Sequence, residues 1–448
     1  MTQRNEVERA RAPQDRRTAS GTSTGRLVAA SLIGTIFEFY DLILYATVSA
    51  LLFAELYFPQ QNEFVSTIFV WSAFAIGYLM RPIGAIIFGH IGDKIGRKRV
   101  LVVTLLIMGT VTVVIGVLPT YQQIGVAAPI VLVVLRLAQG VAAGGEHGSA
   151  TVMLIEHKNK SRHRGFLAAL PTAGSVVGAL LATATIALLT SVTSDDQFQA
   201  WGWRIPFLAS GVLLVLGYVV RRKVTEPEVM RDAMASGTIV RAPLFTLLRK
   251  YPKQMVLALA PPFVIFFTYY LALLVSVPYA ASAGGSGKSF LLTMSTIGQI
   301  VYALAIGGFA AVSDKVGRRP PMLVGSILLA GWAFAFFPLL LSGNGFAVFL
   351  AFAGLFIAVG CIYGPVPAFL TECFGTEVRL TGMSVVYQVA GAIAGGFAPL
   401  IATSLLAAYH SWIPLAGLIL IGCCATFVAA VLSKDSSRKD IAEVSVPD

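Results

Sequence analysis

Charged side chains are scarce in this chain: Asp, Glu, Lys and Arg make up only 12% of its 448 residues, whereas 56% are hydrophobic. Water-soluble domains carry about 25% charged residues, so a composition with a mean hydropathy of +0.78 excludes an ordinary soluble protein. Apolar runs of about 20 residues, the length that a helix needs to cross a bilayer, recur along the chain. The sequence therefore predicts an integral membrane protein.

Cysteine and histidine are also few, with four and five residues. The cysteines lie in or at the ends of apolar runs without paired spacing, which argues against disulfides and against a metal site. No Ser/His/Asp set or metal-spaced histidine cluster emerges, so we do not expect an enzyme. The stretch "SAGGSGKSF" (282–290) ends like a phosphate-binding loop, but Ser282 stands where the first glycine is required, so nucleotide hydrolysis is not expected either.

Twelve apolar spans follow one another between residues 27 and 433, which predicts an all-α membrane fold with twelve transmembrane helices. The expected spans are 27–55, 64–90, 100–118, 127–155, 166–190, 204–222, 254–280, 289–312, 321–341, 345–371, 380–408 and 411–433.

The net charge of +11 is distributed unevenly. If the amino terminus is cytoplasmic and the spans alternate, nearly every Lys and Arg falls in a cytoplasmic segment, as the positive-inside rule requires. The rule accounts for the charge, so we expect no nucleic-acid partner. Residues 1–26 are polar and hold six arginines, which predicts a disordered cytoplasmic tail and no removable signal sequence. Both termini are expected in the cytoplasm, with the chain in the cell (plasma) membrane among lipid, as a monomer.

A charged motif occurs twice. "GHIGDKIGRKRV" (89–100) and "AAVSDKVGRRPP" (310–321) place Asp93 and Asp314 at an offset of 221 residues. Glu156 and Glu372 are 216 residues apart. These offsets predict two homologous six-span halves, 27–222 and 254–433, with a linker at 223–253 and a second cytoplasmic tail at 434–448. Internal repeats of this kind are typical of secondary transporters, which bind substrate between the halves near the membrane midplane.

The repeated pattern G-x-x-x-D-[KR]-x-G-R-[KR] resembles the signature of the major facilitator superfamily. The first half further resembles the metabolite:proton symporters in "GTIFEFYDLILY" (34–45), "GYLMRPIGAIIFGHIGDKIGRKR" (77–99), "LRLAQGVAAGGEHG" (135–148) and "WGWRIPF" (201–207). The resemblance implies two pseudo-symmetric six-helix bundles and uptake of a metabolite such as shikimate, citrate, oxoglutarate, a dicarboxylate, proline or betaine. The second half matches more weakly.

The repeated charged loops suit a cytoplasmic gate, because an aspartate can face the amino end of a neighbouring helix while spaced glycines allow close approach. For Asp93 the resemblance implies that the neighbour is span eleven and that the contacts lock the outward-facing state. The alternative is that these residues only orient the chain, but orientation requires Lys and Arg rather than aspartate or glycine. The predicted gate residues are Gly89, Asp93, Arg97, Lys98, Glu156, Arg164, Asp314, Arg318, Glu372 and Arg379.

Ionisable residues inside the spans persist only where they pair or face a watery cavity. They are concentrated in the first half, which predicts that proton coupling occurs there; the candidates are Glu38, Asp41, Arg136 and Glu146. We expect Asp41 and Arg136 to meet. A carboxylate beside a permanent cation keeps a low pKa, and separating such a pair in a desolvated site raises it, so that rocking of the halves would couple to proton uptake. The alternative is a static buried pair that fixes helix register.

Two neighbouring residues leave alternatives open. Glu146, flanked by glycines, is either a second proton site or a substrate ligand. His147 stands where relatives carry an aromatic residue, and either titrates near neutral pH or packs through a hydrogen bond.

Small-molecule sites combine aromatic walls with a few hydrogen-bonding groups. The predicted substrate-binding residues are Arg81, Tyr45, His147, Tyr269, Tyr270, Gln299, Tyr363, Tyr387 and Gln388. Individual tyrosines could equally be packing residues.

The sequence thus predicts a secondary transporter that imports a small polar metabolite with protons by alternating access, without a cofactor beyond the coupling proton. An organic acid is favoured because Arg81 and Arg136 can offer paired donors to a carboxylate. A zwitterion such as proline or betaine is the alternative substrate. One alternative function is a proton-coupled exporter on the same fold. Exporters of this superfamily typically carry proline after the second glycine of G-x-x-x-G in span five, whereas Gly178 is followed by alanine here. The other alternative is a receptor that senses its ligand without transport.

Overall fold

The computed structural model describes residues 24–59, 62–95, 97–146, 151, 163–222, 243–283, 286–375 and 378–433. Within these segments the chain forms helices and no strands, and twelve helical stretches are long and apolar enough to cross a membrane. The predicted all-α fold with twelve spans is confirmed. Within the predicted fourth span, 127–155, helix α7 ends at Gly144, where the chain turns at Gly145. Residues 147–150 and 152–155 of that span lie outside the described residues. The division of the chain at residues 26, 222, 253 and 433 stays a prediction.

Spans one to six form the first bundle. Its elements are α2 (Thr24–Val48), η1 (Ser49–Phe53), α3 (Ala54–Tyr57), α4 (Glu63–Ile95), α5 (Arg97–Val117), α6 (Tyr121–Ile124), α7 (Ala127–Gly144), α9 (Arg164–Val192), α10 (Asp195–Gln197), η2 (Phe198–Gly202) and α11 (Arg204–Arg222).

Spans seven to twelve form the second bundle, preceded by the short helix α13 (Pro243–Lys250). Its elements are α14 (Pro252–Tyr270), η3 (Leu271–Val275), α15 (Ser276–Ser282), α16 (Lys288–Val316), α17 (Arg319–Leu340), α18 (Gly345–Tyr363), α19 (Val366–Glu372), α20 (Arg379–Ala390), η4 (Gly391–Gly396), α21 (Phe397–Tyr409) and α22 (Ile413–Leu432).

The long apolar segments are helical because hydrocarbon offers no partner to a backbone N–H or C=O, so each segment must satisfy its own. Two helix termini lie at residues that are suited to capping or ending a helix. Asn344 caps α18 by accepting from two backbone amides, and α16 ends at Gly317, whose φ of 96° lies in the left-handed region that favours glycine.

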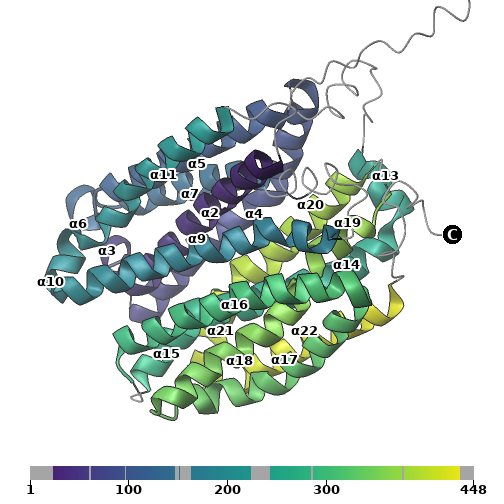
Figure 1. Cartoon of the computed structure of the whole chain (residues 1–448). Helices are drawn as coiled ribbons and strands as arrows, with labels where there is room; N and C mark the ends of the chain where they lie inside the picture. The colour runs from purple at the N-terminus through teal and green to yellow at the C-terminus, as the bar shows by residue number, and fades with distance from the viewer. Residues whose placement is uncertain are drawn as a thin grey trace, which may run out of the picture.

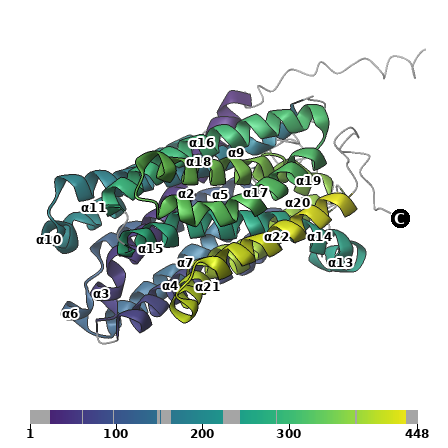
Figure 2. The ribbon, with the colours of Figure 1, turned by 90° about the horizontal axis from the view of Figure 1, so that it is seen from below.

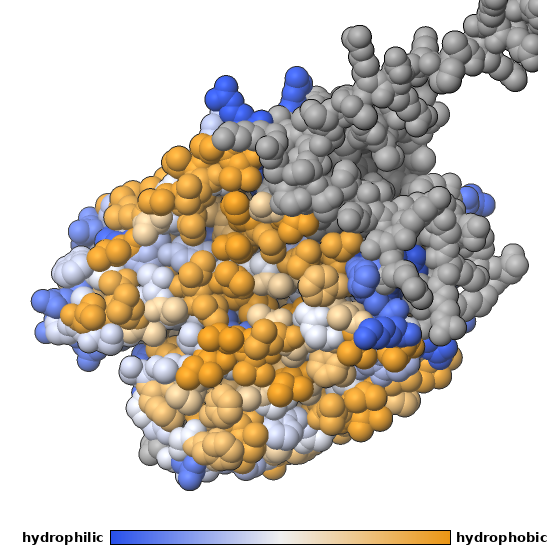
Figure 3. All heavy atoms as spheres, viewed as in Figure 1, coloured by the Kyte–Doolittle hydropathy of each residue, from blue (hydrophilic) through white to orange (hydrophobic). Residues whose placement is uncertain are grey.

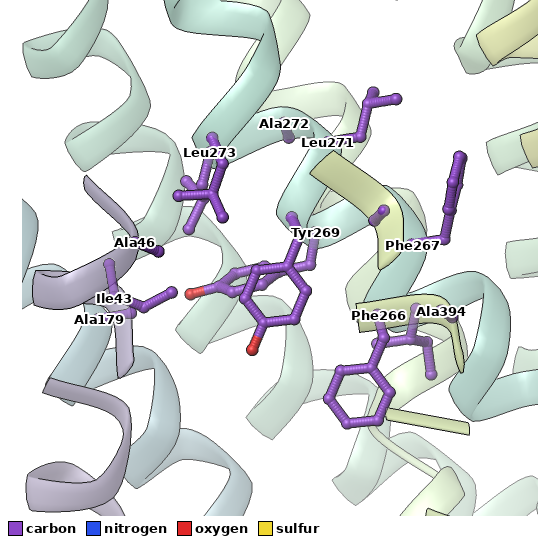
Figure 4. Packing of buried hydrophobic residues seen from close by; sticks show 14 of the residues in the cluster. Ile43, Ala46, Ala179, Phe266, Phe267, Tyr269, Leu271, Ala272, Leu273 and Ala394 are labelled. Carbon is purple, nitrogen blue, oxygen red and sulfur yellow. The ribbon is translucent and has the colours of Figure 1, made fainter. Parts of the chain in front are cut away.

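The two bundles lie side by side, and the axes of their helices are roughly aligned (Figures 1 and 2). The first bundle is coloured purple to teal and the second green to yellow. They meet along two seams related by the repeat: α9 packs against α16, and α4 packs against α20, η4 and α21. Span five therefore faces span eight, while span two faces span eleven. Figure 4 shows part of the interface, where Ile43, Ala46 and Ala179 face Tyr269 and Leu273.

Hydrophobic residues cover much of the face seen in Figure 3, and hydrophilic residues gather at the two ends of the helices. Large apolar side chains point outward along these helices, among them Leu304 at 72% exposure and Val256 at 68%. Such a surface is unstable in water and suits the hydrocarbon of a bilayer.

Glycines let neighbouring helices approach until backbones touch. A Cβ atom on Gly140 would collide with the carbonyl oxygen of Gly77, and one on Gly144 with that of Arg81, so α7 lies directly against α4. Gly178 brings α9 equally close to the backbone of α2 at Ile36. Small residues at helix contacts are the usual means of close packing in membranes.

We expect Gly144→Val to destabilise the protein by roughly 1–3 kcal/mol or more, because the new side chain must displace the backbone of α4. The midpoint of thermal unfolding of purified protein in detergent measures this effect. Gly331→Val is the matched control, since no atom lies within 4 Å of a Cβ at that position. Equal midpoints for the two variants would contradict the close-packing argument.

Candidate functional site

Among the buried ionisable side chains of the first bundle, four form a cluster: Glu38 and Asp41 on α2, Arg81 on α4 and Arg136 on α7, none more than 5% exposed. The predicted placement of ionisable groups within the first half therefore produces one central cluster of two carboxylates and two guanidinium groups. Their burial is costly in hydrocarbon unless each charge finds a partner.

Glu38 and Arg81 form a direct ion pair, with 3.0 Å between Oε1 and Nη1. The guanidinium group of Arg81 also lies 4.3 Å from the ring centroid of Tyr78, one turn earlier on α4, in a cation–π contact. The second carboxylate oxygen of Glu38, Oε2, has no hydrogen-bond partner among the described residues.

Asp41 and Arg136 do not form the direct pair expected from the sequence. The Gln139 side chain lies between them: its Nε2 donates to both carboxylate oxygens of Asp41, at 3.0 and 2.9 Å, while its Oε1 accepts from Arg136 Nη1 at 2.5 Å. Gln139 can do this because an amide carries a donor and an acceptor and because it lies three residues after Arg136, on the same face of α7. Thr112 on α5 donates a further hydrogen bond of 2.5 Å to Asp41.

Arg136 is otherwise held by aromatic rings. Its guanidinium carbon lies 3.7 Å from the ring centroid of Tyr45 and 5.9 Å from that of Phe74. Its Nε atom has no hydrogen-bond partner among the described residues. Tyr45, predicted as a substrate-binding residue, thus contacts Arg136. No carboxylate lies within ion-pair distance of this arginine in the described part of the chain.

Sequence reasoning missed Thr112 and Gln139. The signal for Gln139 was present in "LRLAQG", where an uncharged amide stands three residues after an arginine in an otherwise apolar span. Thr112 carried no such signal, because a threonine hydroxyl in a membrane helix can bond its own backbone, as Thr112 also does to Met108.

Glu146 lies just beyond the end of α7 and forms an ion pair with Arg221 of α11, which also donates to the backbone of Leu101. Gly34 on α2 packs against both members of the pair. The contact ties spans one, four and six together, and Glu146 pairs with Arg221, not with Arg81 or Arg136. Arg221 is only 6% exposed, and Glu146 compensates its charge.

The second bundle contributes buried tyrosines. The hydroxyls of Tyr363 and Tyr387 lie 2.6 Å apart, and the Tyr270 hydroxyl contacts that of Tyr78, which links the second bundle to the first beside Arg81. The ring centroids of Tyr269 and Tyr302 are 5.5 Å apart. These aromatic groups bring α14, α16, α18 and α20 to the side of the central cluster.

Several polar atoms of this aromatic wall have no hydrogen-bond partner among the described residues: Tyr269 Oη, Tyr302 Oη, Gln299 Oε1 and Gln388 Nε2. The Nε2 atom of Gln299 donates to Thr183 Oγ1 on α9 at 3.1 Å and so joins the two bundles. Buried polar groups without partners are rare in folded proteins, and each is a place where a ligand could bond.

A second polar cluster lies at the end of the bundles where α9 begins. Asp314 on α16 accepts hydrogen bonds from the backbone N–H groups of Gly165 and Phe166, at 2.8 and 3.0 Å, and so caps the amino end of α9. A carboxylate is favourable there because the helix dipole leaves positive charge at that end. The turn at Gly317 brings Arg318 back onto Asp314, with 2.8 Å between Nη1 and Oδ1.

The same cluster joins the two bundles through Glu372. This carboxylate on α19 lies 3.0 Å from Arg164 Nε of the first bundle and 3.2 Å from Arg318 Nη2 of the second. Burial alone would lower the pKa of Arg318, but the Glu372 and Asp314 carboxylates raise it overall, so the arginine stays charged. The structure therefore brings together Arg164, Asp314, Arg318 and Glu372 of the predicted gate.

The other predicted gate residues, and His147, fall on parts of the chain that the structure does not describe in full. Glu156 and His147 lie outside the described residues. The side chains of Gly89, Asp93, Arg97, Lys98 and Arg379 fall outside the described part of their helices. Their roles stay predictions, although Asp314 shows at α9 the arrangement that the sequence predicts for Asp93 at span eleven.

Twelve membrane spans in two bundles, with buried charges inside the first bundle and a polar cluster that joins the bundles at one end, are typical of a membrane transporter. The sequence pattern of the Major Facilitator Superfamily matches residues 31–399, and the chain belongs to this family. The resemblance noted from the sequence is confirmed.

Three relatives give the family position more detail. The chain is 37% identical over 393 residues to an inner membrane metabolite transport protein of Escherichia coli, covering 86% of this chain and 89% of the relative. It is 34% identical over 433 residues to a shikimate transporter of Escherichia coli, covering 95% and 98%. It is 32% identical over 400 residues to a citrate-proton symporter of Klebsiella pneumoniae, covering 87% of each. The protein is a metabolite transporter, not an enzyme.

The fold is similar to that of a solved proton:xylose symporter bound to 6-bromo-6-deoxy-D-glucose. The TM-score is 0.72 at 16% sequence identity, and the match covers 94% of this chain and 98% of the other. At this identity the likeness concerns the fold alone.

We expect Asp314→Asn to lower the midpoint of thermal unfolding, since the loss of charge at the amino end of α9 removes about 1–2 kcal/mol of capping and dipole energy. It also leaves Arg318 with one fewer carboxylate partner. The control is Asp196→Asn, which removes an exposed carboxylate from α10. A shift no larger than that of the control would contradict the capping role.

Proposed function

We propose that the protein is a proton-coupled symporter that imports a small organic acid by alternating access. The observation that carries the proposal is the buried polar chain Asp41–Gln139–Arg136 in the first bundle. An aspartate inside a membrane protein, near an arginine but not bonded to it, is suited to gaining and losing a proton as its surroundings change.

The coupling step follows from the partners of Asp41. Thr112 and Gln139 both donate hydrogen bonds to it, which stabilises the ionised form. A movement of α7 relative to α2 breaks the two bonds from Gln139 and removes the influence of Arg136. The carboxylate, left desolvated, then takes up a proton, and the reverse movement releases it. Gln139 is thus a positioning residue for the coupling reaction.

An organic acid suits the charges of the cluster. Two buried guanidinium groups offer paired donors to a carboxylate, and the relatives include a shikimate transporter and a citrate-proton symporter. A zwitterion is the second candidate, because the free oxygen of Glu38, Oε2, beside Arg81 could accept from an ammonium group.

The second polar cluster, formed by Arg164, Asp314, Arg318 and Glu372, is suited to act as the cytoplasmic gate. It holds the bundles together at the end that the Lys and Arg distribution assigns to the cytoplasm, with both termini on that side. In this state the central cluster would be reached from the opposite side, and breaking the Arg164–Glu372 pair would open the inward route.

The direct test is transport by purified protein in proteoliposomes, with a radiolabelled panel of shikimate, lactate, oxoglutarate, citrate and proline. We expect at least one of these probes to accumulate against its gradient when the outside is acidic, and not when the pH is equal on both sides. Accumulation that is indifferent to pH on either side would refute proton-coupled uptake.

Asp41→Asn should abolish accumulation driven by the pH gradient while sparing exchange of substrate down its gradient, because asparagine retains a hydrogen-bonding side chain but cannot be deprotonated to a carboxylate. Counterflow and pH-driven uptake in the same vesicles separate the two activities. Asp196→Asn serves as the control and should behave as wild type. Retained accumulation by Asp41→Asn would rule out the coupling role of this residue.

A further inference from the structure

The four charges of the central cluster, Glu38, Asp41, Arg81 and Arg136, sum to zero. The two carboxylates differ in their bonding partners, and so do the two arginines. Resting on the proposed function, we infer that the site carries one monoanionic carboxylate together with one proton, in a cycle that moves no net charge. Asp41 takes the proton and Arg136 receives the substrate carboxylate.

The charges near Asp41 are few. The described spans of the second bundle carry no charged residue in their central parts, and their Lys, Arg, Asp and Glu residues lie only at the span ends. Glu146 and Arg221 compensate each other near the end of α7. The side chains that contact the cluster are uncharged: Thr112 and Gln139 bond Asp41, and the rings of Tyr45 and Tyr78 lie against Arg136 and Arg81. The Tyr270 hydroxyl of the second bundle contacts that of Tyr78. The net charge of the centre is therefore set by two carboxylates and two guanidinium groups, which cancel.

The two carboxylates are not equivalent. Protonation of Glu38 would break its 3.0 Å ion pair and leave the buried Arg81 without an ionised partner, which is strongly unfavourable. Asp41 touches no guanidinium group: its partners are the neutral Thr112 and Gln139. It can take up a proton without leaving a bonded arginine unpaired, so one proton, not two, enters per cycle.

The two arginines differ in the same way. Arg81 is neutralised by Glu38, whereas Arg136 contacts only an amide oxygen and aromatic rings, and its Nε has no partner among the described residues. Protonation of Asp41 removes the negative charge that lies across Gln139 from Arg136. The carboxylate of the substrate then supplies that charge, and the centre is neutral again.

This balance selects the substrate by its charge. A monoanion with one proton leaves the loaded centre neutral, as the empty centre is. A dianion would leave one buried negative charge and a zwitterion one buried positive charge, and each uncompensated charge in a desolvated site disfavours binding. The free atoms Tyr269 Oη, Tyr302 Oη, Gln299 Oε1 and Gln388 Nε2 add neutral hydrogen-bonding positions, which suit uncharged hydroxyl groups on the rest of the substrate.

The panel of probes in proteoliposomes tests the charge selection. We expect shikimate or lactate, both monoanions at neutral pH, to show the highest uptake driven by a pH gradient. Highest uptake of oxoglutarate, citrate or proline would overturn the inference while leaving proton-coupled transport intact. Accumulation of none of the probes would instead overturn the proposed function, and the inference with it.

The stoichiometry is then measured with the preferred monoanion, using valinomycin and potassium to set the membrane potential. We expect accumulation of about tenfold per unit of pH gradient, because one proton moves with each anion. An inside-negative potential should change neither the rate nor the final level. Accumulation of about a hundredfold per pH unit, or uptake that responds to the potential, would overturn the one-to-one neutral cycle.

A charge-changing variant provides an independent check. Glu38→Gln gives the centre one additional positive charge, so a dianion with one proton becomes the balanced load. We expect the ratio of oxoglutarate to monoanion binding, measured by protection from thermal unfolding, to rise about tenfold or more relative to wild type. Glu55→Gln is the matched control, because this glutamate is exposed on α3 and accepts a hydrogen bond from Gln199. An unchanged ratio in a folded Glu38→Gln protein would contradict the charge-balance argument.

Discussion

The hydrogen-bonded chain from Asp41 through Gln139 to Arg136 is the interaction on which the proposed mechanism depends. A carboxylate and a guanidinium group in direct contact form a strong pair that resists separation in a medium of low dielectric constant. An amide between them keeps both groups bonded but lets each change its partner at a lower cost. This arrangement leaves Asp41 able to titrate and Arg136 able to receive an anion, whereas the direct pair of Glu38 and Arg81 keeps its charges fixed.

Backbone contact at glycines makes this arrangement possible. Arg136 and Arg81 lie on α7 and α4, and these helices touch because Gly77, Gly140 and Gly144 have no side chains at the contact. With larger residues the helices would separate by several ångströms, and buried charges that depend on hydrogen-bond distances would lose their partners. The seams between the bundles depend less on glycine and more on single polar links, such as Gln299 to Thr183 and Arg164 to Glu372, which can break and re-form.

The two bundles divide the work. The first holds the charges of the centre, and the second presents tyrosines and amides without any charge at that depth. In the proposed function, charge balance concerns the first bundle, whereas recognition of the neutral part of a substrate concerns the second. The cluster of Arg164, Asp314, Arg318 and Glu372, the proposed gate, is a third unit. In it Asp314 both caps α9 of the opposite bundle and pairs with Arg318 of its own bundle. Its repeat at Asp93 remains a prediction.

Length and hydropathy by themselves determined the helical class and the number of spans, because hydrocarbon permits a buried segment of this length almost no other structure. The family followed from the resemblance of the repeated charged motifs. Length and hydropathy also located the ionisable residues, since a charge in an apolar run is visible without coordinates. Only the tertiary structure decided the partners. Asp41 bonds Gln139 and Thr112 instead of Arg136, and Glu146 bonds Arg221 instead of the centre, because helices distant in sequence bring these groups together. Spacing along one helix fixes which face a side chain occupies, but the rotation and separation of packed helices fix what it meets.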